Sequence, residues 1–379
     1  MKQTARIIST YAADVFGVCS ALFELGGMTV MHDASGCNST YSTHDEPRWY
    51  DMDSMVFISA LSEMEAIMGD DEKLINDIAS AAKELHPKFI AIAGTPIPTM
   101  TGFDFTAVAG LVEQQTGIPT FGFATTGMNT YVHGASMALR GIAGRFVKAQ
   151  SKSENLSANI LGLTPLDFSV NGTDKSIAAF LKEAGFEVVS KWAMGSTLEE
   201  LSDAAKAQVN LVVSVSGLGA AELLYEKFGM PYVIGLPIGE KQKELLKKAL
   251  LDAVKSGENK SVYSEIEGGE IAVIGEGVTS LALATAIELE TSKGVKVLCA
   301  TDCPEGVLRA KDRVTPDEDD IIPEIENVQA IIADPLYNPI CPKTAKFIRL
   351  GDEAFSGRMF RSEIPDLVSD FKSILKEVL

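Results

Sequence analysis

The sequence contains few cysteines and histidines and no long apolar run. Of its 379 residues, five are cysteine, four are histidine and two are tryptophan. The cysteines are odd in number and lack the spacing of a secreted disulfide framework, so we expect a reducing, cytoplasmic environment. No stretch approaches 18 apolar residues, so no membrane-spanning helix is predicted. Asp14 and Glu24 interrupt the apolar residues near the amino terminus, and we therefore expect no signal peptide there.

Basic residues are scarce relative to acidic ones. The chain has 33 Lys and Arg against 52 Asp and Glu, which gives a formal net charge of −19. A charge of this sign and size disfavours nucleic acid and anionic membrane surfaces, and we expect neither as a partner. The pattern Gly-x-x-x-x-Gly-Lys-Ser/Thr is absent from the sequence, so the chain is not expected to hydrolyse ATP itself.

The pattern that is present is that of a globular α/β protein. Hydrophobic residues make up 46% of the chain and charged residues 22%, which is sufficient for a large core. Apolar runs such as Pro87–Gly94 and Pro119–Phe123 read as buried strands, and Phe105–Thr116 between them reads as a helix. Strands that alternate with helices in this way predict parallel sheets with crossover helices.

The length of the chain suggests two to three domains, and polar stretches between periodic segments suggest where they divide. We predict three doubly wound, Rossmann-like domains and a helical tail. Their limits are residues 1–150 for the first domain, 158–265 for the second, 266–350 for the third, and 351–379 for a tail that packs back on them.

Two cysteines near the amino terminus form the main candidate site. Met28–His32 reads as a strand, and Cys37 lies in the loop after it, where α/β sheets place their ligands. Cys19 lies on the helix predicted before that strand. Thiolates are the usual ligands of iron–sulfur clusters, and a four-iron cube takes four of them, so a second chain must supply two more. The alternative is that Cys19 is a core residue and Cys37 an ordinary loop thiol.

The loop resembles that of a known family. His32-Asp-Ala-Ser-Gly-Cys37 is similar to the "His-Gly-Pro-x-Gly-Cys" loop of the nitrogenase component 1 superfamily, and Gly94–Ile97 with Gly102–Asp104 resembles its "Cys-Pro-…-Gly-Asp-Asp" segment. The family often has a third cluster cysteine where this chain has Thr95. That departure, and a spacing between Cys19 and Cys37 shorter than the family's usual one, favour a simple cube over an eight-iron cluster.

The resemblance implies a fold and a function. It implies three Rossmann-like domains of nitrogenase component 1 type, with Cys19 and Cys37 binding a [4Fe-4S] cluster shared between two subunits. The protein would be a homodimer or a paralogous heterodimer. A separate P-loop iron–sulfur ATPase would deliver electrons, and a small-molecule substrate would be held between the domains. A tetrapyrrole is the first expectation, as in the F430 reductive cyclase and the protochlorophyllide reductases, and a small organosulfur or unsaturated compound is the second.

Two other classes of function remain open on the sequence. A scaffold for metallocluster assembly would keep the cysteines and turn nothing over. A nucleotide-dependent α/β enzyme would use the Gly275-Glu-Gly277 turn, which follows a predicted strand and opens a helix. That turn is two-thirds of a dinucleotide fingerprint, because Ser280 replaces its third glycine.

The remaining cysteines and histidines give weaker signals. Cys299, Cys303 and Cys341 read as one strand cysteine and two loop thiols rather than a second metal site. Nitrogenase proper anchors its large cofactor with one Cys and one His from the second and third domains. This chain has no cysteine in the second predicted domain and no histidine beyond residue 133, so the resemblance does not extend to that cofactor, and dinitrogen reduction with it is not expected. Each of the four histidines has a candidate role: His32 to orient the loop or move protons, His44 and His133 to donate protons from rim loops, and His86 to cap a helix.

Overall fold

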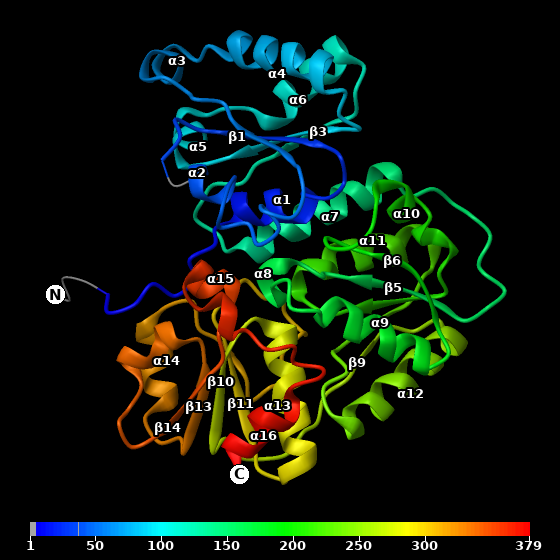
Figure 1. The fold of residues 1–379 in the computed structure, drawn as a ribbon, viewed down its shortest axis with the longest axis vertical. Helices are drawn as coiled ribbons and strands as arrows, with labels where there is room; N and C mark the ends of the chain where they lie inside the picture. The colour runs from blue at the N-terminus through cyan, green and yellow to red at the C-terminus, as the bar shows by residue number, and fades with distance from the viewer. Residues whose placement is uncertain (1–4, 37) are drawn as a thin grey trace.

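Three parallel β-sheets follow one another along the chain in the computed structural model, which describes residues 5–36 and 38–379. Helices flank each sheet, so the molecule is built of three α/β domains (Figure 1). This confirms the predicted fold class. The predicted limits of the domains remain predictions, although the strands of the three sheets fall within residues 28–123, 157–261 and 271–349.

The strand orders are those of doubly wound sheets. The first sheet has the order β2-β1-β3-β4, the second β6-β5-β7-β8-β9 and the third β12-β11-β10-β13-β14. The strands of the first sheet are β1 Met28–His32, β2 Met55–Ile58, β3 Ile90–Gly94 and β4 Thr120–Phe123. Those of the second are β5 Ser157–Leu161, β6 Glu187–Lys191, β7 Val209–Val212, β8 Tyr232–Ile234 and β9 Lys260–Ser261. Those of the third are β10 Ile271–Gly275, β11 Val295–Cys299, β12 Arg313–Val314, β13 Ala330–Ala333 and β14 Lys346–Arg349.

Helices connect the strands. In the first domain they are α1 Asp14–Leu22, α2 Asn38–Tyr41, α3 Glu63–Met68, α4 Asp71–Leu85, α5 Pro96–Thr101, α6 Phe105–Thr116 and α7 Tyr131–Phe146. In the second they are α8 Pro165–Phe168, α9 Thr173–Glu183, α10 Leu198–Ser202, α11 Leu218–Phe228 and α12 Glu240–Ser256. In the third they are α13 Gly277–Thr291, α14 Glu318–Ile325, α15 Glu353–Ser356 and α16 Phe371–Val378. Within the described residues, no helix has the length and apolar character needed to cross a membrane.

The sequence pattern placed most of these elements correctly, but it made the last helix too long. The sequence predicts a helix over Ile364–Leu379, whereas α16 begins only at Phe371. The Asp366 side chain accepts a hydrogen bond from the Val368 N–H, and the Asp366 carbonyl accepts one from the Asp370 N–H. A side chain that bonds to its own backbone in this way stabilises a turn in place of the first turns of a helix.

Helices α1 and α7 pack closely, because a glycine on each helix lies against a backbone carbonyl of the other. A Cβ added to Gly17 would lie 1.9 Å from the Tyr131 carbonyl oxygen. A Cβ added to Gly134 would lie 1.8 Å from the Asp14 carbonyl oxygen. Only glycine fits at such an approach. This contact fixes α1, the helix that carries Cys19, against the core of the first domain.

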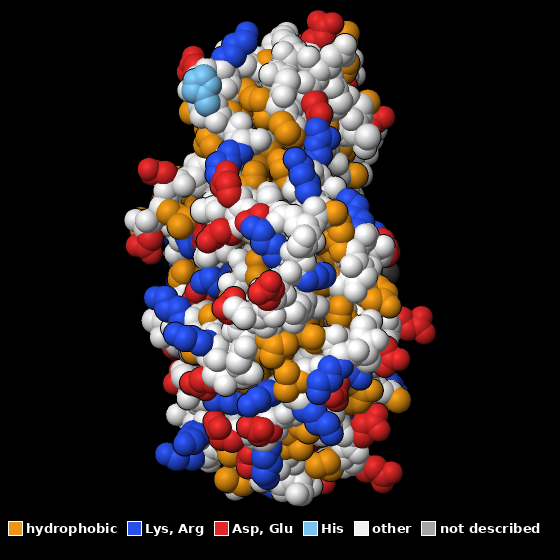
Figure 2. Space-filling model, turned by 90° about the vertical axis from the view of Figure 1, so that its right-hand side faces the viewer, with side chains coloured by type: hydrophobic (Ala, Val, Ile, Leu, Met, Phe, Trp, Pro, Cys, Tyr) orange, Lys and Arg blue, Asp and Glu red, His pale blue; other side chains and the backbone are white. Residues whose placement is uncertain are grey.

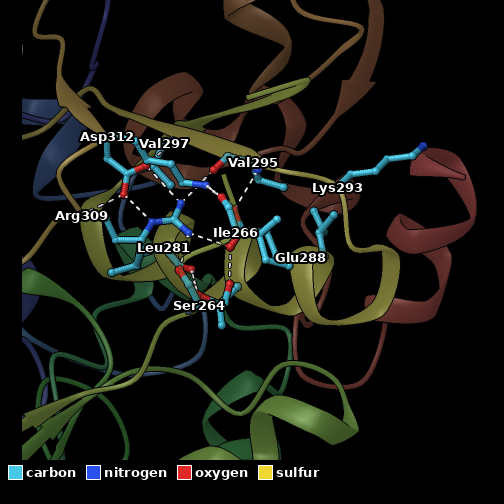
Figure 3. A network of polar contacts seen from close by, with 12 residues as sticks. Ser264, Ile266, Leu281, Glu288, Lys293, Val295, Val297, Arg309 and Asp312 are labelled. Carbon is cyan, nitrogen blue, oxygen red and sulfur yellow. Dashed lines mark hydrogen bonds and ion pairs between the residues drawn. The ribbon is translucent and has the colours of Figure 1, made fainter. Parts of the chain in front are cut away.

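A buried ionic network ties the third domain to the segment that leads into it (Figure 3). The Arg309 guanidinium lies 2.8 Å from the Glu288 carboxylate and 2.8 Å from the Asp312 carboxylate. It also donates to the Ser264 carbonyl at 2.9 Å, and Ser264 precedes the first strand of the third sheet. Lys311 adds a second ion pair to Glu288 at 2.6 Å. The network therefore anchors the connection between the second and third sheets.

Charged side chains are dispersed over the face of the molecule that Figure 2 shows. Figure 2 shows a face on which acidic and basic side chains are interspersed and hydrophobic side chains are scattered. This face carries no broad basic patch of the kind that binds nucleic acid.

Candidate functional site

The first sheet has a topological switch point between β1 and β3. The chain leaves β1 for the edge strand β2 and leaves β3 for the opposite edge strand β4, while β1 and β3 pair with each other. Their last residues, His32 and Gly94, are register partners. The crevice beyond such a pair of carboxyl ends is where open α/β sheets bind ligands. The predicted cluster loop starts at this point, directly after His32.

His32 is held at the start of the loop by neighbours from two other elements. Its Nδ1 lies 2.9 Å from the Ser59 hydroxyl, which follows β2, and its ring centroid lies 4.4 Å from that of Phe103. The Thr95 hydroxyl donates to the His32 carbonyl at 3.2 Å. Burial lowers the pKa of His32 to about 4, although the Asp33 charge opposes the shift. A neutral, fixed ring of this kind orients the loop.

The loop has the unusual backbone that its composition predicts. Ser35 and Gly36 adopt φ angles of +134° and +54°. Asp33 makes two contacts that hold the loop. Its carboxylate accepts a hydrogen bond from the Asn38 side chain at the other end of the loop. Its carbonyl accepts one from the Leu61 N–H at 2.8 Å, which ties the loop to the segment after β2. Cys37 itself lies outside the described residues. The contacts of His32 and Asp33 anchor the start of the loop, and the contact of Asn38 with Asp33 anchors its end.

Cys19 lies in the middle of α1, and its side chain is 1% exposed. Burial, and then the nearby Glu46 charge, raise the pKa of the Cys19 thiol. One carboxylate oxygen of Glu46, Oε1, accepts from the Arg48 side chain at 2.7 Å. The other, Oε2, is buried and has no hydrogen-bond partner among the described residues. A buried thiol and an unsatisfied carboxylate oxygen thus occur in the same region of the first domain.

The segment after Cys37 packs on the helix that carries Cys19. Tyr41 in α2 stacks on Phe16 of α1, with the ring centroids 4.5 Å apart and the ring planes 8° apart. Helix α2 begins one residue after Cys37, so this contact brings the end of the loop to α1. Among the residues that the structure describes, no three His, Cys, Asp or Glu side chains are grouped so that they could hold a metal ion.

The other histidines lie apart from these contacts. His86 ends α4 in the left-handed conformation and is exposed, as expected of a solvated cap. His133 lies exposed in the first turn of α7 instead of in a loop. His44 lies in a turn after α2, and its carbonyl accepts from Arg361 at 3.4 Å.

A large cavity lies between the first and third domains. Its volume is about 620 Å³, and its lining includes Tyr11, Tyr41, Thr130, Asp302 and Cys303. The wall combines aromatic faces with hydroxyl, carboxylate and thiol groups. A cavity of this size and mixed polarity is suited to a small organic molecule.

A second, smaller cavity of about 40 Å³ brings together buried acids of the second and third domains. Asp167, Glu276, Asp334 and Asp352 line it. Burial raises the pKa of each, in the case of Asp167 to about 7. The Tyr131 hydroxyl of α7 donates to Asp167, so the first domain also reaches this cluster. The sequence alone does not reveal the cluster, because each acid taken singly has the appearance of a turn or capping residue.

Glu276 also bears on the nucleotide-binding alternative. Its carboxylate accepts from the Thr279 N–H at the start of α13 and from the Val215 N–H, both at 2.8 Å. Dinucleotide-binding folds place a pyrophosphate at the equivalent helix start. Here the buried Glu276 carboxyl group already occupies those donors, so they are not free to bind a phosphate. The geometry therefore disfavours the nucleotide-dependent enzyme that the Gly275–Gly277 turn left open.

Fold and site together define a class of protein: a chain of three parallel α/β domains with a topological switch point in the first sheet and a cavity between the first and third domains. Comparison with known proteins identifies the class further. The family model for nitrogenase component 1 type oxidoreductases matches residues 15–301. The chain belongs to this family.

Its relatives include proteins of more than one role. The chain is 31% identical over 184 residues to the nitrogenase iron–molybdenum cofactor biosynthesis protein NifE of Clostridium pasteurianum. It is 29% identical over 174 residues to a component of the light-independent protochlorophyllide reductase of Chlorobium phaeobacteroides. These matches span 47% and 44% of this chain but only 38% and 32% of the relatives' own lengths.

The fold similarity is more extensive than the sequence similarity. The structure titled "Nitrogenase Cp1 at pH 6.5" superposes on the whole of this chain and on 93% of its own, with a TM-score of 0.74. The sequence identity in that superposition is 17%. The similarity therefore concerns the architecture of the three domains.

Proposed function

We propose that this protein is the catalytic component of a nitrogenase-like reductase. Electrons would come from an ATP-dependent iron–sulfur protein and enter through a [4Fe-4S] cluster shared between two subunits. They would then reduce a substrate bound between the domains. The observation that supports the proposal is that, in a chain of this family, the segment after the Cys37 loop packs on α1, the helix that carries Cys19.

The donor groups of one chain fit half of such a cluster. Cys19 is a free thiol, and Cys37 follows the loop that starts at His32. Thr95 does not supply a third ligand, because its hydroxyl bonds to the His32 carbonyl. A second copy of the chain, or a paralogous chain, would provide the other two thiolates. The unpartnered Glu46 oxygen is a further donor on this chain.

The cluster would supply single electrons at low potential, and the residues of this chain would hold and orient its ligands. Coordination to iron removes the proton from a thiol, which overcomes the raised pKa of Cys19. His32 and Asp33 would hold the loop so that Cys37 meets its site in one orientation. The close packing of α1 on α7 would keep Cys19 in place.

The elements that start at the rim of the first sheet also offer a surface for a second protomer. Exposed apolar side chains gather on α3, on α5 and in the loop before α7. They are Met64, Ile67, Met68, Met100 and Met128. Large exposed apolar side chains that share one region are typical of protein–protein interfaces.

The cavity of about 620 Å³ is the candidate substrate site. A tetrapyrrole remains the first choice of substrate, since a protochlorophyllide reductase component is among the relatives. A small organosulfur or unsaturated compound is the second choice. The assembly scaffold stays a second candidate function, because a cofactor biosynthesis protein is also among the relatives.

Anaerobic purification tests the cluster. We expect a brown protein with about four irons per dimer. Cys19→Ala and Cys37→Ala should each lose the colour and the iron, whereas Cys341→Ala, which removes a partly buried thiol of the third domain, should keep both. A Cys37→Ala variant with full iron content would refute the ligand assignment. Turnover with a cognate ATPase and reductant would then separate a reductase from a scaffold, which would keep its iron and reduce nothing.

A further inference from the structure

A second pair of cysteines meets in the third domain. Cys299 is the last residue of β11, and Cys303 lies in the loop that follows. Both sulfurs approach the first residue of α13, Gly277. A Cβ placed on Gly277 would lie 2.9 Å from the Cys303 sulfur and 3.6 Å from the Cys299 sulfur. The absence of a side chain at Gly277 therefore makes room for the two thiols to converge.

The two thiols differ in access. Cys299 is fully buried, and its sulfur lies 3.5 Å from the Thr301 carbonyl. Cys303 is partly exposed and lines the cavity between the first and third domains. A small oxidant in that cavity would reach Cys303 first, with Cys299 directly behind it. The hydrogen bond from Cys299, together with burial, raises the pKa of the Cys303 thiol.

Asp302, which directly precedes Cys303, connects two domains. The Asp302 carboxylate accepts from the Thr130 N–H at 2.8 Å and from the Thr130 hydroxyl at 2.6 Å. The Asp302 N–H donates back to the Thr130 hydroxyl at 3.2 Å. Thr130 stands immediately before α7 of the first domain. The contact between Asp302 and Thr130, which we call the interdomain clasp, thus sits on the same short loop as the thiol pair.

We propose that Cys299 and Cys303 form a reversible disulfide when a peroxide enters the interdomain cavity, and that this bond loosens the interdomain clasp. The Cys303 thiol gives up its proton as its sulfur attacks one peroxide oxygen, and the products are a sulfenic acid and one water. The Cys299 thiolate then attacks the Cys303 sulfur and expels the hydroxyl group as a second water. Two thiols and one hydrogen peroxide become one disulfide and two waters, and a dithiol reductant reverses the oxidation.

The link from the bond to the clasp follows from distances. A disulfide requires the sulfurs to lie about 2.05 Å apart, much closer than hydrogen-bonded thiols. Cys299 belongs to a strand paired on both sides and cannot move far, so closing the bond pulls on the loop that carries Cys303. Asp302 moves with that loop, while Thr130 remains on the first domain. This inference does not depend on the iron–sulfur cluster, because neither cysteine belongs to the proposed cluster site.

Mass spectrometry of the full chain tests the bond. Trypsin releases residues 297–309 as one peptide, which contains both cysteines and no other. After treatment with hydrogen peroxide and alkylation, we expect this peptide unalkylated and about 2 Da lighter than its dithiol form, with dithiothreitol restoring two alkylation sites. Cys303→Ser should abolish the lighter form, and the control Cys341→Ser should leave it unchanged. Two alkylated cysteines at every peroxide concentration, or sulfinic acid at Cys303 without a disulfide, would overturn the proposal.

Hydrogen exchange tests the clasp in the same samples. The Thr130 amide, whose hydrogen bond goes to Asp302, should exchange several-fold faster in the oxidised protein. The Cys303→Ser variant treated with peroxide should show no such change. A disulfide that forms while the Thr130 amide stays equally protected would show that the bond and the clasp are uncoupled, and would overturn the second half of the proposal.

Discussion

Replacing Arg309 by methionine should destabilise the third domain strongly. The Arg309 side chain is 2% exposed, and the Glu288 and Asp312 side chains are fully buried. Methionine fills similar volume but provides no donors. Asp312 would keep the N–H donors of Val297 and of residue 309, but would lose its charge partner. Glu288 would keep Lys311.

The loss of unfolding free energy expected for Arg309→Met can be estimated. Removing one partner of a buried ion pair costs about 3–5 kcal/mol, because the other charge stays buried. Lys311 compensates one of the two carboxylates, so we expect about 3 kcal/mol, at the lower end of that range. With a urea m-value of about 2–3 kcal/mol/M, the midpoint of the affected transition should fall by about 1–1.5 M.

The assay compares two arginines. Arg349 pairs with Glu363 on the surface, where both side chains are about half exposed, and Arg349→Met should cost less than about 1 kcal/mol. Urea unfolding by circular dichroism gives the midpoints, and hydrogen exchange at the Val297 amide reports on the third domain itself, because that amide bonds to Asp312. Equal midpoints for Arg309→Met and Arg349→Met would refute the reasoning.

Three further changes test other parts of the structure. Gly17→Ala should lower the free energy of unfolding by about 1–3 kcal/mol, because the new Cβ meets the Tyr131 carbonyl. The control Gly110→Ala, on an open helix face, should be neutral or slightly stabilising. Equal urea midpoints for the two variants would contradict this. Burial raises the pKa of Asp167 from 3.8 to about 7, so the folded state holds a proton that the unfolded state releases. The free energy of unfolding should therefore fall as the pH rises from about 4 to about 7. Asp167→Asn should flatten that decline, and an unchanged slope would contradict the prediction. Burial lowers the pKa of His32 from 6.5 to about 4, so the free energy of unfolding should fall as the pH drops from 6.5 to about 4. His32→Asn should remove this loss. A variant as acid-sensitive as the parent protein would contradict the prediction.

The sequence was most informative where one physical signal acted alone. The apolar run that ends at Gly94 predicted a buried strand, and Ile90–Gly94 is one, with every residue buried. The sequence from Glu63 to Leu85 has helical periodicity that Gly69 interrupts, which predicts a break there, and Gly69 ends α3 in the left-handed conformation. These features depend on local periodicity and backbone freedom, both of which can be read from neighbouring residues.

The site was predictable only in part, because much of its chemistry depends on contacts between distant residues. The loop after His32 could be located from its glycine and polar residues. The neutral state of His32 depends on burial beside Ser59 and Phe103, which lie 27 and 71 positions further along the chain. The convergence of Cys299 and Cys303 depends on the bare Cα of Gly277 on another element. No spacing rule in a single sequence identifies such contacts.

The arrangement of Cys19 and the interdomain cavity gives the proposed electron path a definite geometry. Ala13 lines the cavity and immediately precedes α1, and Cys19 lies six residues further along. At 1.5 Å per residue, the two are separated by about 9 Å along the helix axis. Cys19, which would hold the cluster, therefore lies on the helix that starts at the cavity wall, and this helix fixes its distance from the cavity. The proposed reductase requires such proximity, and an iron-loaded protein that turns over no substrate with a cognate ATPase and reductant would identify the scaffold instead.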